Sequence, residues 1–227
     1  SHTPQQIENL LKRSFAAYLM ARGRKQGKIR KSGFNTQPSL QNEFVRHLAF
    51  LKETEFVDEN DLLTEDGQWA SRLRIDQPLL VAEALRLGLF PVRNPMLLAA
   101  VMAAFVNDKE SEERMDRRTW PKDLVAAILQ IKKGLTGFAR HMTFSGFPVR
   151  NLYPLPAAVV YAWAQGEEWK KIVRRFRIAE GDLSMLILRT ADNLRHIKAL
   201  KDPFPEAAET AKKSIELILR VPVTLGQ

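Results

Sequence analysis

Residues 154–197 read PLPAAVVYAWAQGEEWKKIVRRFRIAEGDLSMLILRTADNLRHI, and no other stretch is as informative about the architecture. Pro154 opens an apolar helix that carries Tyr161 and Trp163 and is expected to end at Gly166. A short basic amphipathic helix over 167–175 follows. After a corner at Glu180 a long helix is predicted over 181–199. Three helices joined by such short turns are typical of a helical bundle.

The flanking sequence predicts more helices and one small β element. Helices are expected over 3–20, 40–51, 64–73, 79–87, 95–105, 121–142 and 205–220, with Gly88 closing one, Asn94-Pro95 opening the next and Thr119 capping the long one. Phe56-Val57 and Leu62-Leu63 are expected to form two short strands around a polar turn. We therefore predict a mainly α fold: a helical bundle with a small winged-helix-like subdomain that contains a short β-hairpin.

Three segments are expected along the chain. Residues 1–38 hold an N-terminal helix and a basic linker, residues 39–76 the winged-helix-like subdomain, and residues 77–227 the helical bundle. There is no cysteine, so disulfides, thiolate metal sites and thiol nucleophiles are excluded. That lack is compatible with a cytoplasmic location, which we expect. No apolar run is long enough to span a bilayer, so no membrane partner is expected.

The net charge of +9 and the pI near 9.9 favour polyanionic partners, because lysine and arginine release counterions when they neutralise phosphates. The basic residues gather in two clusters. The first occupies 22–31, RGRKQGKIRK, and the second comprises Lys170, Lys171, Arg174, Arg175 and Arg177. The first cluster is equally compatible with a solvated linker, whereas for the second a solvated helix face is the less favoured alternative.

No catalytic motif accompanies this charge. Asp58-Glu59-Asn60-Asp61 spells DExD, but no buried strand precedes it and the chain contains no GxxxxGK[ST] loop to face it, so a turn is the better interpretation. The four histidines are scattered without metal-ligand spacing. We expect no catalytic residue, no metal site and no cofactor in this chain. Tyr161 and Trp163 are expected in the core.

The helix over 181–199 places two groups of side chains on different faces. An apolar group faces the bundle: Leu183, Leu186, Ile187, Thr190, Leu194 and Ile197. Met185, Arg189, Asp192 and His196 fall on a neighbouring shoulder, with Asn193 beside them. Such a row can face solvent, which the spacing alone favours. It can also face a polymer strand, with Arg189 stacking on a base or binding a phosphate.

Several motifs together resemble the C-terminal helical (DSHCT-type) domain of superkiller-type DExH-box helicases. They are the corner Glu180-Gly181-Asp182-Leu183 with Arg189 eight residues after its glycine, Val159–Ala164, and Leu79–Glu83 followed by Gly88-Leu89-Phe90. Residues 44–73, with Leu63-Thr64 and Gly67 before Ala70, resemble the winged helix that precedes this bundle in the same helicases, and Leu10–Phe15 resembles the segment just after their second RecA-like domain. The resemblance extends from about residue 4 to 220, is strongest over 157–197 and weak over 107–153. A relative without the arch insertion, of prokaryotic type, matches best.

The resemblance implies that this chain is the C-terminal accessory part of an ATP-dependent helicase. Two RecA-like domains elsewhere in the same polypeptide would bind ATP and Mg²⁺, and the winged helix and bundle would grip single-stranded nucleic acid, RNA rather than DNA. The implied contact residues are Arg189, Met185, Asp192, Asn193, His196, Lys170, Arg174 and Arg175. The competing hypothesis is a non-enzymatic DNA-binding regulator or adaptor that reads duplex DNA with its winged helix and its basic helix. A purely structural interaction module is a third alternative.

Overall fold

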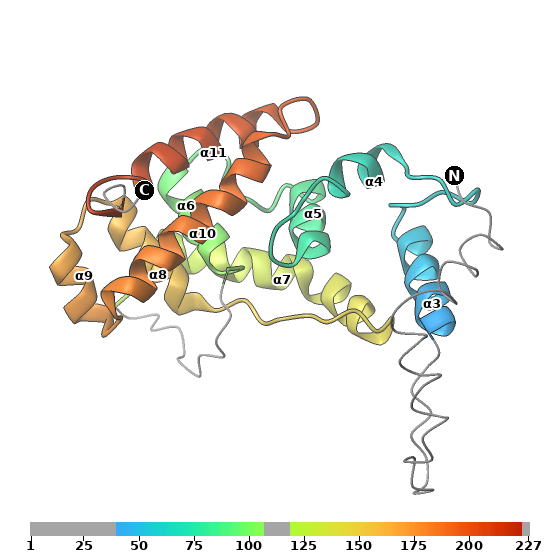
Figure 1. The fold of residues 1–227 in the computed structure, drawn as a ribbon, viewed down its shortest axis with the longest axis horizontal. Coiled ribbons are helices and arrows are strands. Elements are labelled where there is room, and N and C mark those ends of the chain that lie inside the picture. The colour runs from blue at the N-terminus through green and yellow to red at the C-terminus, as the bar shows by residue number, and fades with distance from the viewer. Residues whose placement is uncertain (1–39, 107–118, 224–227) are drawn as a thin grey trace, which may run out of the picture.

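A computed structural model of the chain describes residues 40–106 and 119–223, and Figure 1 shows their arrangement. The predicted helix over 3–20 and the basic cluster over 22–31 lie outside the described residues. The helices are α3 Leu40–Glu53, α4 Glu65–Ala70, α5 Pro78–Arg86, α6 Pro95–Ala103, α7 Lys122–Phe144, α8 Pro154–Ala164, α9 Trp169–Phe176, α10 Glu180–Lys198 and α11 Pro205–Ile218. The prediction of a mainly helical bundle is confirmed.

Two short apolar helices form the centre of the bundle. All residues of α6 from Leu97 to Ala103 are buried, and in α8 only Leu155 is partly exposed. α6 packs against α7, α8, α10 and α11, so it lies enclosed by other helices. A helix that is apolar on every side is stable only when its whole surface is covered, and this need draws the amphipathic helices around α6 and α8.

Local signals at the helix ends agree with the sequence in most places. The Asn94 side chain accepts hydrogen bonds from the backbone N–H groups of Met96 and Leu97, both at 3.1 Å, and so caps α6. Gly88 and Gly166 take the left-handed conformation, with φ of 61° and 93°, after α5 and α8. The prediction for Thr119 is wrong, because α7 begins at Lys122 with Pro121 at its N-cap.

The predicted β-hairpin is also wrong. Within residues 40–106 and 119–223 the only β pairing is an isolated antiparallel bridge between Val57 and Leu63. The backbone N–H groups of Phe56 and Val57 both donate to the carbonyl of Leu51, at 2.9 and 3.1 Å, and thereby complete the end of α3. On the other side Thr64 already caps α4 by accepting from Gly67 N at 3.0 Å. Across the turn Asp58 N donates to the Leu62 carbonyl at 2.8 Å and Thr64 N to the Phe56 carbonyl at 3.2 Å, and the pairing does not extend beyond this single bridge.

A side chain also closes the polar turn between these helices. Oδ1 of Asp58 accepts hydrogen bonds from the backbone N–H groups of Asn60 and Leu62, at 2.9 and 2.8 Å. This is the local hydrogen bonding by which aspartate favours turns over regular ladders. The interpretation of DEND as a turn is therefore confirmed, and the winged-helix-like subdomain lacks its β-hairpin wing.

At the far end from α9, α3 packs on the C-terminal part of α7 (Figure 1). The Phe50 ring contacts those of Phe138, His141 and Phe147, at centroid distances of 5.5, 4.8 and 4.9 Å. His141 Nε2 also lies 2.8 Å from Oε2 of Glu53. α7 thus runs from the bundle to α3 and connects the two ends of the described structure.

Candidate nucleic-acid interface

The start of α10 is anchored to α9 and α8 through two tryptophans. Trp169 Nε1 donates to Oε2 of Glu180, the first residue of α10, at 3.2 Å. The Trp169 ring meets Trp163 of α8 edge to face at 5.4 Å between centroids. Trp163 is buried, as predicted, and so is Tyr161. The corner resembling the family motif is therefore the first turn of α10, and its position is set by packing against the core.

α10 buries one face and leaves a shoulder accessible. Leu183, Ile187, Thr190, Leu194 and Ile197 are buried, as the spacing predicts, while Leu186 is only partly buried. On the shoulder Met185 is 57% exposed, the side chain of Asp192 is 64% exposed, and His196 is partly exposed. The row predicted from helical spacing thus exists as a partly accessible surface. No contact with nucleic acid is demonstrated by this, and the contact residues stay a prediction.

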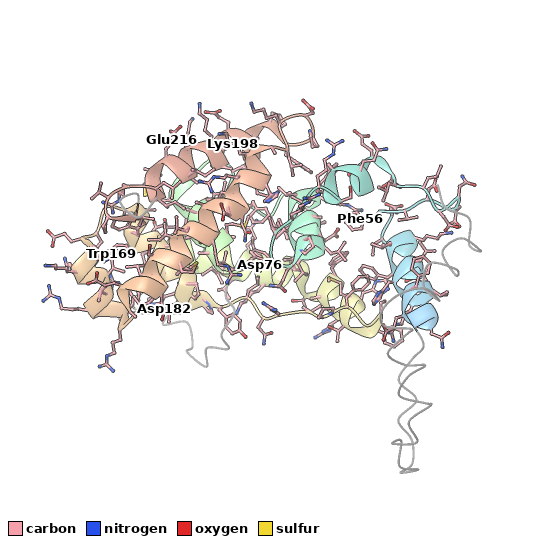
Figure 2. The ribbon with its side chains drawn as sticks, in the orientation of Figure 1. Phe56, Asp76, Trp169, Asp182, Lys198 and Glu216 are labelled. Carbon is pink, nitrogen blue, oxygen red and sulfur yellow. The ribbon has the colours of Figure 1, made fainter. Side chains whose placement is uncertain are left out.

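Arg189 does not point freely into solvent. Its Nη2 donates to both carboxylate oxygens of Asp76, at 3.1 Å to Oδ1 and 3.0 Å to Oδ2. The two side chains keep exposed fractions of 30% and 25%. Figure 2 labels Asp76 near the centre of the molecule, between α5 and the middle of α10. Arg189 is therefore a half-buried guanidinium held in place by the segment that leads into α5.

The other predicted residues of α10 differ in character. Asn193 is only 5% exposed, and its Nδ2 is a buried donor without a hydrogen-bond partner among the described residues. Asp192 forms an ion pair with Arg195. Since a carboxylate repels phosphate, Asp192 is the least suited of the row to contact a nucleic-acid backbone. Asn193 lies one turn from Arg189, but its amide is buried and is not part of the accessible shoulder.

The basic residues of α9 form a separate exposed group. Lys170, Arg174 and Arg175 are all exposed, and Arg175 also donates to Glu167 at 3.0 Å and lies over the Phe176 ring at 4.9 Å. α9 packs on α8 and occupies one end of the molecule (Figure 1). The structure thus divides the predicted site residues between the α10 shoulder and the outer face of α9.

One residue that orders the candidate site was not predicted. Asp76 precedes Arg189 by 113 positions, and helical spacing carries no information about a contact at that separation. The adjacent Gln77 has a left-handed backbone, with φ of 53°, and its Oε1 accepts a hydrogen bond from the backbone N–H of Arg150 at 2.9 Å. Residues 76–77 therefore contact both α10 and the segment that precedes α8.

Two further features bear on the class of site. In the described part of the chain, no three His, Cys, Asp or Glu side chains are grouped so as to hold a metal ion. Among the same residues, no helix is long and apolar enough to cross a membrane.

Tyr161, which donates to Asp123 Oδ2 at 2.6 Å, has its pKa raised to about 12 by burial and by this carboxylate, so it stays protonated.

Comparison with known proteins places this site in a family context. Residues 60–225 match the DSHCT (NUC185) domain. This chain belongs to the DSHCT domain family. The match covers the whole of α4 to α11, including the α10 shoulder, Asp76 and α9.

Its relatives are helicases several times longer. The chain is 24% identical over 206 residues to the DExH-box ATP-dependent RNA helicase DExH15, chloroplastic, of Arabidopsis thaliana, covering 83% of this chain and 17% of that protein. It is 26% identical over 170 residues to the antiviral helicase SKI2 of Saccharomyces cerevisiae, covering 70% and 13%. It is 38% identical over 71 residues to the probable helicase HelY of Mycobacterium tuberculosis, covering 30% and 8%. The chain thus spans less than a fifth of these relatives, and the predicted resemblance is confirmed.

Proposed function

We propose that the chain is the C-terminal accessory region of an ATP-dependent helicase and that it holds single-stranded nucleic acid against the shoulder of α10. The ATPase motor would lie in RecA-like domains of the same polypeptide, which would supply ATP and Mg²⁺ binding. The observation that carries the proposal is Arg189, an arginine on the accessible shoulder of α10 in a domain of the DSHCT family.

The chemistry of the shoulder suits a strand that must slide. Arginine binds a phosphate through paired N–H donors and stacks on any base, so its contacts are independent of sequence. Met185, which is 57% exposed, offers a flexible apolar surface next to it. Because such contacts are weak and independent of sequence, they resist movement of the strand little. A translocating enzyme needs this low resistance between its power strokes.

RNA is the proposed substrate rather than DNA. The support is the relative from Arabidopsis thaliana, whose name describes an RNA helicase and which aligns with 83% of this chain. The described residues around Arg189 include both donors and acceptors, which a 2′-hydroxyl can use.

The proposal is tested by binding of labelled single-stranded oligonucleotides to the 227-residue chain. We expect weak binding with strong salt dependence, and we expect Arg189→Gln to lower the affinity at low salt about five- to tenfold. Arg93→Gln is the matched control, because it also removes one arginine, which lies outside α10 and pairs with Glu206 of α11 at 3.3 Å. Equal affinity of all three proteins would reject Arg189 as a contact.

The same binding assay, repeated with duplex DNA, tests the competing hypothesis of a DNA-binding regulator. The exposed basic face of α9 is the observation that favours it, since such a helix can enter a major groove. The β-hairpin wing on which the regulator hypothesis also relied, however, does not form between α3 and α4. A preference for duplex over single strand, abolished by Lys170→Gln and Arg174→Gln but not by Arg189→Gln, would support the regulator instead.

A further inference from the structure

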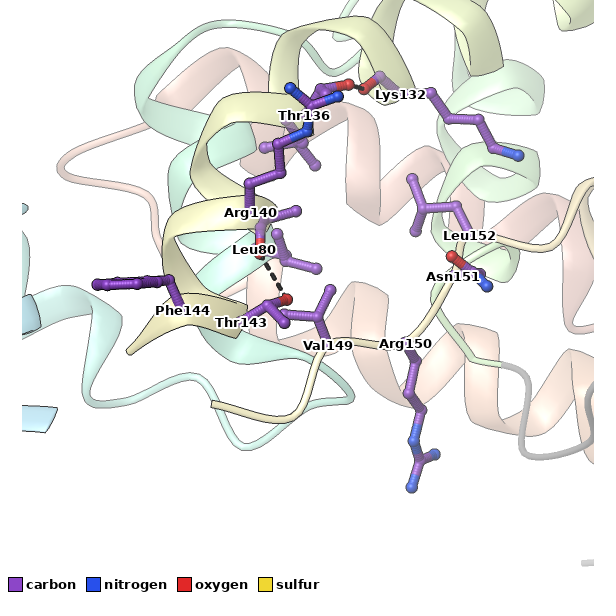
Figure 3. A pocket seen from close by; sticks show the side chains of 12 residues that line it. Leu80, Lys132, Thr136, Arg140, Thr143, Phe144, Val149, Arg150, Asn151 and Leu152 are labelled. Atoms are coloured by element: carbon purple, nitrogen blue, oxygen red, sulfur yellow. Dashed lines mark hydrogen bonds between the residues drawn. The ribbon is translucent and has the colours of Figure 1, made fainter. Parts of the chain in front are cut away.

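A cleft of about 690 Å³ opens between the C-terminal half of α7 and the segment 149–152 (Figure 3). Its floor is apolar and is formed by Leu80, Leu135, Ala139, Val149 and Leu152. Its rim is polar and carries Lys132, Thr136, Arg140, Thr143, Arg150 and Asn151. Phe144, on the last turn of α7, is 88% exposed beside this rim. None of these residues belongs to the α10 shoulder or to α9.

The cleft carries positive charge without any acid. No aspartate or glutamate lines it, and the sequence from Leu124 to Tyr153 contains none. The Lys132 ammonium and the Arg140 guanidinium have no hydrogen-bond or ion-pair partner among residues 40–106 and 119–223. Arg140 is exposed, but Lys132 is partly buried, and this burial lowers its pKa. A partly buried and unpaired ammonium is destabilising unless an anion compensates it.

The position of the cleft links it to Arg189. The backbone N–H of Arg150 donates to Oε1 of Gln77 at 2.9 Å, and the preceding residue, Asp76, holds Arg189. Figure 3 shows the Arg150 side chain extending outward from the mouth of the cleft, away from Lys132. A chain of contacts therefore runs from Arg189 through residues 76–77 to the mouth of the cleft. Residues 76–77 thus join the cationic cleft to the shoulder of α10.

We propose that the cleft between α7 and residues 149–152 binds the phosphate backbone of the single strand beyond Arg189, with Lys132 and Arg140 as phosphate contacts and Phe144 as a stacking surface for a base. This inference rests on the proposed function. The apolar floor suits bases or sugars, and the two unpaired cations suit phosphates, so the mixed lining fits a polynucleotide better than a lone anion.

The experiment measures anisotropy of labelled single strands of 4 and 16 nucleotides with the 227-residue chain. A short strand can occupy either site alone, whereas a long one can occupy both. We expect Lys132→Gln/Arg140→Gln to weaken the 16-mer about tenfold at low salt and to lower the slope of log affinity against log salt by about 1.4, which corresponds to two phosphate contacts on a single strand. Phe144→Ala is expected to weaken the 16-mer about fivefold.

The control variant is Lys201→Gln/Lys212→Gln. It also removes two positive charges, here those of two exposed lysines in the α10–α11 connection and in α11, on the side away from α7 (Figure 1). Equal weakening by the control and the cleft variant would mean that only net charge matters, and would overturn the inference. Thermal unfolding of each variant, compared with the unaltered chain, checks that the fold is retained.

Two further measurements separate this inference from the proposed function. Crosslinking of a 16-mer carrying 4-thiouridine is expected on peptides that contain residues 132–144 and 149–152, and crosslinks confined to α9 and α10 would overturn the cleft. Loss of binding in Arg189→Gln with no effect of the cleft variant would reject the cleft alone. The reverse pattern would reject Arg189 alone. Competition by tripolyphosphate as strong as by an oligonucleotide, without dependence on strand length, would identify a simple anion site and reject the strand.

Discussion

Arg189 and Asp76 are joined by hydrogen bonds of 3.0 and 3.1 Å from one guanidinium nitrogen to both carboxylate oxygens. This pair connects the middle of α10 to the segment that leads into α5. It also means that the arginine proposed to hold a phosphate already has an anionic partner. A phosphate and Asp76 compete for the same donors unless the strand approaches from another side of the guanidinium.

This competition predicts the effect of Asp76→Asn. The amide keeps the size of the side chain and can still accept a hydrogen bond, but it no longer neutralises Arg189. We expect the affinity for single strands to rise about threefold at low salt, and the rise to shrink as salt screens the charge. The measurement is oligonucleotide anisotropy at several salt concentrations.

Asp202→Asn is the control for that variant, because it removes an exposed carboxylate from the connection between α10 and α11. It is expected to change affinity less than Asp76→Asn. If Asp76→Asn weakens binding as much as Arg189→Gln does, Asp76 serves to orient the guanidinium, and the competition argued here does not occur.

A second prediction compares two glycines. A Cβ on Gly67 of α4 would lie 1.9 Å from the backbone oxygen of Phe56, so the short helix can pack there only without a side chain. We expect Gly67→Ala to reduce the free energy of unfolding by about 3 kcal/mol, since backbone has to move. Gly137 lies within α7, where a Cβ meets nothing within 4 Å. Gly137→Ala is therefore expected to stabilise by about 0.5–1 kcal/mol through helix propensity.

Both glycine variants are measured by thermal and urea unfolding. The pair controls for the chemical change itself, because each adds one methyl group to a helical glycine. A loss of stability in both variants would indicate that α7 is packed against something at Gly137. Unchanged stability in Gly67→Ala would contradict the close approach of α4 to the Phe56 carbonyl.

Much of this fold follows from local sequence signals. Asn94-Pro95, Gly88 and Gly166 mark helix ends where a cap or a left-handed residue is required, and the structure has helix ends at each of them. The wholly apolar stretch of α8 predicted burial, which holds for Tyr161 and Trp163. Such signals are readable because they depend on a few neighbouring residues.

The errors arose where contacts between distant or competing groups decide the outcome. Two apolar dipeptides around a polar turn suggest a hairpin, but the N–H groups of Phe56 and Val57 donate to the end of α3 and α4 is capped by Thr64 directly after the second dipeptide. The contact of Arg189 with Asp76 joins residues that no periodicity relates. The cleft on α7 needed the return of residues 149–152 beside that helix, although the absence of acids from 124 to 153 was a usable signal.

A third prediction concerns pH. Glu83 is partly buried, and this burial is the main cause that raises its pKa above the ordinary value of 4.5. The positive charge of Arg86, whose Nη1 lies 3.6 Å from Oε2 of Glu83, lowers the same pKa. A carboxyl whose pKa is higher in the folded than in the unfolded chain contributes most to the free energy of unfolding at low pH. Its contribution is lost as pH rises from the ordinary value through the raised folded pKa.

Glu83→Gln removes this titration. We expect the melting temperature of the variant, relative to the unaltered chain, to increase as pH rises from about 4 to 7. Glu65→Gln is the control, since Glu65 is an exposed carboxylate of the neighbouring helix α4. A relative melting temperature of Glu83→Gln that falls over this pH range would show that the ion pair with Arg86 outweighs burial.

The last prediction tests the closure at the C-terminal end of the bundle. Trp163 Nε1 donates to the carbonyl of Ile218 at 2.8 Å, while Arg220 lies over the Trp163 ring at 3.4 Å and donates to the Trp163 carbonyl at 2.7 Å. Trp163→Phe keeps an aromatic ring for Arg220 but removes the indole donor, so the Ile218 carbonyl retains only the bond from the Arg220 backbone N–H at 3.1 Å, and a small cavity forms. We expect a loss of about 3 kcal/mol in the free energy of unfolding.

Trp169→Phe provides the matched comparison. Trp169 is only partly buried, and its Nε1 bond to Glu180 is exposed to water, which replaces it at little cost. We expect a loss of about 1 kcal/mol, and chemical denaturation of the two variants side by side measures the difference. Equal losses would mean that the contact of Trp169 with Glu180 stabilises the fold as much as the contact of Trp163 with Ile218 does. The placement of α10, and with it of Arg189, would then depend on Trp169 as well as on Asp76.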